Sequence, residues 1–137
     1  MACSNGPCSF KGNVAENTEA YVRNSPVFHA ANVKTPLVIL HNDKDGAVDF
    51  NQGITFFNTL RELGKDVIML QYVGENHGLA QLKNRKDYVL RLQDYWDHHL
   101  KGEKAAEWLE KGVPRLKMDE HLRDMKKRIE PPKKIAM

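Results

Sequence analysis

Two short, continuous apolar runs stand out in the chain, and each is followed by a stretch with helical spacing of apolar residues. Leu37–Leu40 and Val67–Leu70 both contain β-branched side chains, a pattern typical of strands that are covered on both faces. Apolar residues recur at three- and four-residue intervals over residues 49–63, which predicts a helix, and Gly64 stands where a left-handed cap belongs. Residues 85–100 predict a second, longer helix. This order predicts parallel strands joined by a right-handed crossover.

The second predicted helix carries an inner stripe of large side chains, Tyr88, Leu92, Tyr95, Trp96 and Leu100. Before the first strand, residues 16–23 predict a weak helix that stops at Asn24-Ser25-Pro26, because a residue before proline is pushed away from helical angles. After the second helix the chain becomes charged, with a short amphipathic segment around Trp108. We therefore expect an α/β domain with flanking helices over residues 1–102 and a charged C-terminal extension with a short helical segment over residues 103–137.

Composition excludes several classes of protein. Hydrophobic residues make up 41% of the 137 residues, enough for a core, and the formal net charge of +3 is too balanced to indicate a nucleic-acid partner. We expect no membrane span, because no apolar segment is long enough, and no signal peptide. Cys3 and Cys8 are too few for a metal site, and we expect free thiols rather than a small disulfide. The sequence predicts no metal and no cofactor, and it assigns no compartment.

Polar side chains follow both predicted strands at the point where each strand ends. Asp43, Asp45 and Asp49 come after the first strand, and Glu75 and His77 come after the second. Reactive groups of an open parallel sheet gather at the carboxyl ends of its strands, and neighbouring strands lie about 5 Å apart. A carboxylate that accepts a hydrogen bond from one imidazole nitrogen fixes the tautomer, and the other nitrogen can then act as a general base.

Among the three aspartates, Asp45 is the predicted partner of His77. It lies in the middle of its loop, and Gly46 would let the backbone turn so that the carboxylate points across to the other loop. We expect Asp43 to brace the loop, and Asp49 has the position and type of a helix N-cap. An acidic turn or a histidine beside glycine is, taken alone, typical of a plain loop. Their order on successive strand–helix loops favours a catalytic pair.

Several motifs resemble the C-terminal end of the catalytic domain of prolyl oligopeptidase family serine peptidases, which include dipeptidyl and acylaminoacyl peptidases. These motifs are Asn24-Ser25-Pro26, Thr35–His41, Asp45–Val48 and Asn76–Gly78, and the likeness runs from about Asn13 to Gly102. The interval of 32 residues from Asp45 to His77 (77 − 45) fits the family's spacing. The resemblance implies that Asp45 is the triad aspartate and His77 the triad histidine. It also implies a partial α/β-hydrolase fold, without the N-terminal half of the domain. Asn42 departs from the commoner glycine after His41 but leaves Asp45 in register.

The nucleophile that such a pair would serve has no candidate in the sequence. In this fold a serine nucleophile stands in a G-x-S-x-G turn, and Ser4, Ser9 and Ser25 lack the flanking glycines. The resemblance therefore implies a parent serine peptidase that hydrolyses peptide bonds of short peptides and carries its serine upstream of Met1. We expect this chain to be inactive alone.

Two alternatives stay open. The chain could belong to another α/β-hydrolase, such as an esterase with a serine or cysteine nucleophile. It could also be a non-catalytic domain that forms a homo-oligomer through an exposed sheet edge, since unpaired edges invite pairing with another chain. The expected partner is a short peptide substrate of the parent protein, or a second copy of the chain in the last alternative.

Overall fold

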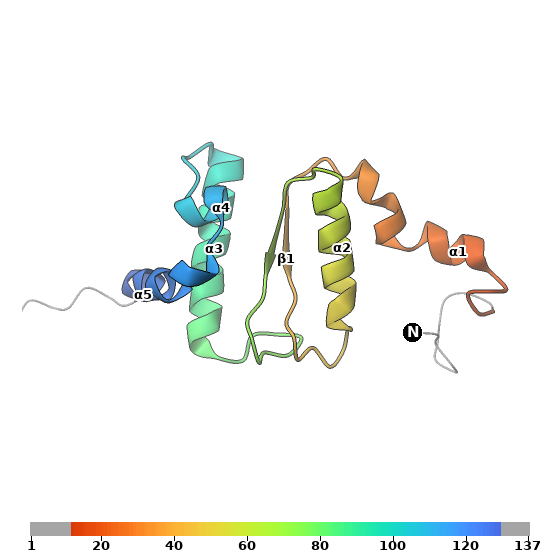
Figure 1. The fold of residues 1–137 in the computed structure, drawn as a ribbon, viewed down its shortest axis with the longest axis horizontal. Helices are drawn as coiled ribbons and strands as arrows, with labels where there is room; N and C mark the ends of the chain where they lie inside the picture. Colours follow the sequence, from red (N-terminus) through yellow and green to blue (C-terminus); the bar gives the residue numbers. More distant parts are fainter. Residues whose placement is uncertain (1–11, 130–137) are drawn as a thin grey trace, which may run out of the picture. The chain divides into compact units, whose positions relative to one another are not determined.

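The computed structural model describes residues 12–129 (Figure 1). The chain divides into two compact units, Met1–His77 and Gly78–Met137. The first unit contains α1 (Thr18–Arg23), the 3-10 helix η1 (Pro26–Asn32), β1 (Leu37–Leu40), α2 (Phe50–Glu62) and β2 (Val67–Leu70). The second contains α3 (Leu82–Lys101), α4 (Glu107–Lys111), the 3-10 helix η2 (Arg115–Lys117) and α5 (Met118–Ile129). The predicted α/β class is confirmed, as are both strands and the two long helices. Cys3 and Cys8 lie outside the described residues, and the boundary expected after residue 102 stays a prediction.

The two strands pair in parallel and in register, from Leu37 opposite Val67 to Leu40 opposite Leu70. Because α2 carries the chain back between them, the carboxyl ends of both strands lie at the same edge of the sheet (Figure 1). The pairing continues one step beyond β1, where the His41 amide donates to the carbonyl of Leu70 at 3.2 Å. The loops that follow the two strands therefore start level with each other.

Strand burial differs from the prediction. Every residue of β1 and β2 is only partly buried, although a continuous apolar run is typical of a strand covered on both faces. Within the first unit, α2 is the helix that packs against the sheet. Apolar strands left partly exposed in this way are typical of part of a larger α/β domain, since one helix cannot cover both faces of a sheet.

Helix α2 begins and ends as its sequence predicts. The Asp49 carboxylate accepts a hydrogen bond from the Asn51 amide at 2.9 Å and so caps the first turn. The chain leaves the helix through Gly64, whose φ of +66° is favourable only for a residue without a Cβ. On the inner face of the helix Leu60 is completely buried.

Gly53 allows α2 to approach the end of β1 closely. A Cβ added at this glycine would overlap Nδ1 of His41 and lie 3.0 Å from its Cγ. On the same side, the His41 ring meets Phe50 edge-on, with ring centroids 5.4 Å apart. The helix therefore fixes His41, the first residue of the loop that carries Asp45.

The second unit is built around charged contacts on α3, which the sequence analysis did not anticipate. The buried residues of this helix are Asp87, Arg91 and Tyr95, one turn apart. Of the expected apolar stripe, Tyr95 is buried, but Trp96 and Leu100 are 47% and 74% exposed. The reason is that a row of ion-pairing residues, rather than the apolar row, faces the rest of this unit.

Helix α5 is a 12-residue helix in a region where the sequence analysis expected a charged extension with a short helical segment around Trp108. Its connection to α3 is the Asp94 carboxylate, which accepts from Arg128 at 2.7 and 2.8 Å in a two-pronged contact. The same carboxylate accepts from the Trp108 indole at 2.8 Å, which also attaches α4. A sequence signal for α5 was available in its apolar residues at helical spacing, Met118, Leu122, Met125 and Ile129. In residues 12–129, none of the helices combines the length and apolar character needed to span a bilayer.

A second contact between α3 and α5 joins Arg91 to His121. Nη2 of Arg91 lies 2.9 Å from Nε2 of His121. A guanidinium can only donate, so Nε2 of His121 is the acceptor and carries no proton. Arg91 is itself buried and paired with Asp87 at 2.7 Å. Burial, followed by the charge of Arg91, lowers the pKa of His121 below its usual value of 6.5.

Gly53→Ala tests the approach of α2 to His41. Replacing a helical glycine with alanine ordinarily stabilises a protein, but here the added carbon overlaps the His41 ring. We expect the free energy of unfolding to fall by about 1–3 kcal/mol, as for an overpacked site. Urea unfolding of this variant beside Gln52→Ala, an exposed alanine substitution on the same helix, measures the difference. A more stable Gly53→Ala protein would contradict the packing described.

His121→Gln tests the Arg91–His121 contact. Because the pKa of His121 is lower folded than unfolded, the unfolded state binds more protons as the pH falls below 6.5. The wild-type chain should therefore lose stability as the pH drops through 6.5 toward the lowered pKa. Glutamine can still accept from Arg91 but does not titrate, so the loss should shrink. Urea midpoints across this range give the comparison, and identical profiles would show that His121 does not contribute.

Candidate active site

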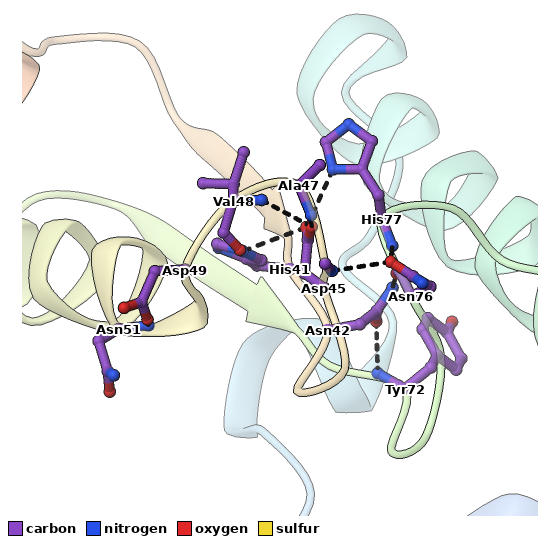
Figure 2. A network of polar contacts seen from close by, with 11 residues as sticks. His41, Asn42, Asp45, Ala47, Val48, Asp49, Asn51, Tyr72, Asn76 and His77 are labelled. Atoms are coloured by element: carbon purple, nitrogen blue, oxygen red, sulfur yellow. Dashed lines mark hydrogen bonds and ion pairs between the residues drawn. The ribbon is translucent and has the colours of Figure 1, made fainter. Parts of the chain in front are cut away.

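Asp45 and His77 meet at the carboxyl edge of the sheet (Figure 2). Nδ1 of His77 lies 2.9 Å from Oδ2 of Asp45. An ionised carboxylate can only accept, so Nδ1 carries the proton and Nε2 is left as the basic nitrogen. Nε2 points away from Asp45 in Figure 2 and has no hydrogen-bond partner among residues 12–129. With 66% of its side chain exposed, His77 is accessible to a ligand.

Asp45 is held by the backbone of its own loop. Its side chain is only 4% exposed, and Oδ1 accepts from the amides of Ala47 and Val48, both at 2.9 Å. The Val48 amide is the largest influence on its acidity. Together with the hydrogen bonds from His77 and Ala47, it outweighs desolvation and lowers the pKa of Asp45 from 3.8 to about 2. The carboxylate is therefore charged at any physiological pH, and among residues 12–129 its ion-pair partners are both histidines.

A second histidine, His41, shares the Asp45 carboxylate. Its Nε2 lies 3.4 Å from Oδ2 of Asp45 and 3.2 Å from the carbonyl oxygen of Val48. Both neighbours are acceptors, so this nitrogen carries a proton. The His41 side chain is 10% exposed, against 66% for His77. His41 therefore supports the carboxylate from the interior, and His77 is the histidine that can exchange a proton with a ligand. The sequence analysis did not assign His41 this contact, although a histidine at the end of β1, four residues before Asp45, was a visible signal.

Asn42 joins the two loops from the inside. It is 1% exposed, its Oδ1 accepts from the Tyr72 amide at 3.0 Å and its Nδ2 donates to the carbonyl of Asn76 at 2.8 Å. Asp43 adds a parallel link, accepting from the Gly74 amide at 2.7 Å. Asp43 thus braces the loop, as predicted. The amide side chain of Asn42 performs a task that a glycine at this position could not, because glycine has no side-chain donor or acceptor.

Gly46 and Glu75, which stand beside the pair in the two loops, take part through their backbone. The chain bends at Gly46, as expected, but Gly46 is not among the described glycines with positive φ, so this bend does not use the left-handed conformation that favours glycine. The carboxylate of Asp45 is oriented by the amides of residues 47 and 48 instead, and the Gly46 amide donates to Oδ1 of Asn76 at 2.9 Å. Glu75, the other acid of the second loop, is 2% exposed, and its carbonyl accepts from the Lys44 amide at 3.2 Å. No three or more His, Cys, Asp or Glu side chains in residues 12–129 are grouped to bind a metal.

The chain is similar to peptidases over this region. A sequence model of the prolyl oligopeptidase family matches residues 7–103. An uncharacterized peptidase of Bacillus subtilis, YuxL, is 32% identical over 88 residues, which cover 62% of this chain and 13% of that protein. The acylamino-acid-releasing enzyme of Arabidopsis thaliana is 28% identical over 87 residues, 64% of this chain and 11% of the enzyme. A probable dipeptidyl-peptidase 5 of Aspergillus flavus is 32% identical over 77 residues, 55% of this chain and 11% of its own length. The chain therefore spans only about a tenth of the length of these relatives.

Asp45→Asn tests the state of the carboxylate. With a pKa of about 2 folded and 3.8 unfolded, ionised Asp45 stabilises the fold fully above 3.8, and this contribution disappears as the pH falls toward 2. The wild-type chain should be more stable than Asp45→Asn near neutral pH, and the gap should close between these two values. Urea midpoints over this pH range provide the measurement. Asp49→Asn is the matched control, because asparagine also caps a helix, and a gap that did not change with pH would contradict the assigned pKa.

Proposed function

Because this chain belongs to the prolyl oligopeptidase family, we propose that it supplies the aspartate and the histidine of the catalytic triad of a serine peptidase. The observation that supports this role is the asymmetry of the Asp45–His77 pair. The carboxylate is buried and charged, while the imidazole is exposed and presents an unoccupied Nε2. Such a pair can accept a proton from a neighbouring hydroxyl and return it.

In the proposed reaction, Nε2 of His77 takes the proton of a serine hydroxyl while the serine oxygen attacks the carbonyl carbon of a peptide bond. The same nitrogen then protonates the leaving amine, and it activates the water that hydrolyses the acyl-enzyme. Between these steps the imidazole is positively charged, and the adjacent carboxylate stabilises that charge. Asp45 does not take the proton itself, because its pKa of about 2 lies far below that of an imidazolium.

We propose that the nucleophile comes from residues outside this sequence. No G-x-S-x-G turn occurs in the 137 residues, and the chain spans 11–13% of the relatives described above. One backbone amide that would stabilise the oxyanion belongs to the residue after the nucleophile, and a second comes from another loop of the domain. Such amides are usually the largest electrostatic contribution to acyl transfer. The 137-residue chain alone is therefore inactive, and the complete peptidase acts on short peptides.

The open edges of the sheet fit the same proposal. Among the described residues the sheet consists of β1 and β2 only, so each strand has one unpaired edge. We propose that these edges pair with further strands of the family's domain. A homo-oligomer formed through them, the alternative drawn from the sequence, would require a second copy to occupy the same positions.

His77→Ala in the complete protein tests the function. Removing the general base should lower kcat by at least about a thousandfold, with little change in KM for a peptide substrate. His29→Ala, an exposed histidine of the same unit, should retain wild-type activity. An active His77→Ala enzyme would refute the assignment of His77. Peptide hydrolysis by the purified 137-residue chain that disappears with the same substitution would instead refute the proposal that the nucleophile lies outside this sequence.

A further inference from the structure

The two residues of the pair are brought together by loops that strand pairing does not hold. Regular pairing ends at Leu40 and Leu70, and Asp45 and His77 follow five and seven residues later (45 − 40; 77 − 70). Packing does not fix the histidine either, because 66% of its side chain is exposed. A hydrogen bond of 2.9 Å to one exposed imidazole is a weak constraint on its own, since solvent competes for it. Other contacts must set the separation of the two loops.

The side-chain carbonyl of Asn76 makes a pair of such contacts. Its Oδ1 accepts from the His77 amide at 2.7 Å and from the Gly46 amide at 2.9 Å. One oxygen atom thus binds the backbone of His77 itself and of the residue directly after Asp45 (Figure 2). The backbone of Asn76 is in turn held by the buried Asn42, which donates to its carbonyl.

The contact between Gly46 and Asn76 does not require glycine, because a side chain would also fit at position 46. A Cβ added to Gly46 would lie 3.7 Å from Oδ1 of Asn76, an ordinary van der Waals distance. What the loop supplies is therefore its amide N–H, and what Asn76 supplies is an acceptor. Nδ2 of Asn76 has no hydrogen-bond partner among residues 12–129, so the acceptor oxygen is the part of the side chain that the site uses.

We infer that Asn76 is a positioning residue for the proposed proton transfer. Beyond the links that Asn42 and Asp43 make between the two loops, its acceptor oxygen holds the backbone of His77 to the residue that follows Asp45. The inference rests on the proposed function of that pair. It assigns Asn76 no contact with substrate. Without the acceptor, the other links still join the two loops, but the backbone of His77 is no longer held to that of Gly46, and the imidazole is out of line for part of the time.

Two substitutions of Asn76 test whether the acceptor oxygen itself is needed or whether any change of this side chain disturbs the loops. Asn76→Ala removes the oxygen. Asn76→Asp keeps an oxygen at the same place and exchanges the unused amide nitrogen for a second oxygen, which adds a negative charge. Because Asn76 is exposed, water can satisfy the freed amides, and the alanine variant should fold with nearly unchanged thermal stability. Asn58→Ala on α2 is the matched control, an exposed asparagine of the same unit.

The first measurement is amide hydrogen exchange in the 137-residue chain, which does not require activity. The amides of Gly46 and His77 should exchange severalfold faster in Asn76→Ala than in the wild type, and Asn76→Asp should retain protection. Asn58→Ala should leave both amides unchanged. Unchanged exchange in Asn76→Ala would overturn the inference, and so would equal acceleration in the alanine and aspartate variants.

The second measurement is steady-state kinetics of the complete peptidase. We expect kcat to fall between about tenfold and about a hundredfold in Asn76→Ala, as for a misplaced catalytic group, with KM unchanged and most of the activity regained in Asn76→Asp. Wild-type kcat in Asn76→Ala, in an enzyme that His77→Ala inactivates, would overturn the inference and leave the proposed function intact. An active His77→Ala enzyme would instead remove the proposed function and the inference with it.

Discussion

The parallel register of β1 and β2 is the constraint on which the site depends. With Leu40 opposite Leu70, both loops leave the sheet at the same level, and residues 32 positions apart in the sequence (77 − 45) come within 2.9 Å. Helix α2 makes this register possible because it returns the chain to the start of β2. Gly53 then lets the helix lie against His41. His41 therefore both packs against α2 and contacts the Asp45 carboxylate.

The electrostatics of the site come from the backbone rather than from a cation. The amides of Val48 and Ala47 and the Nδ1–H of His77 lower the pKa of Asp45 and keep it charged. A carboxylate held in this way remains able to stabilise a positive charge that forms only during a reaction. The two side chains have different environments. Asp45 is buried and stays charged, whereas His77 is exposed and accessible to a reacting group.

The second unit is held together by contacts of a different kind. The family match covers residues 7–103, and α4 and α5 lie beyond it. These two helices attach to α3 through polar contacts to Asp94 and Arg91, with Trp108 and Met125 as their buried apolar residues. Partly buried ion pairs depend strongly on geometry. These contacts therefore fix the positions of α4 and α5 on α3 more than they add to the stability of the unit.

The sequence by itself determined the features that follow from local pattern. Apolar runs marked β1 and β2, helical spacing marked α2 and α3, Asp49 and Gly64 marked the ends of α2, and strand order brought Asp45 to His77. Only the tertiary structure decided the contacts of His41, Asn42 and Asn76, the exposure of Trp96 and the attachment of α5. The physical reason is the distance along the sequence between the residues that interact. Caps and periodic faces are set by neighbours within a few residues, whereas a side-chain amide that bridges two loops leaves no periodic trace and acquires its partners only when distant segments have already paired.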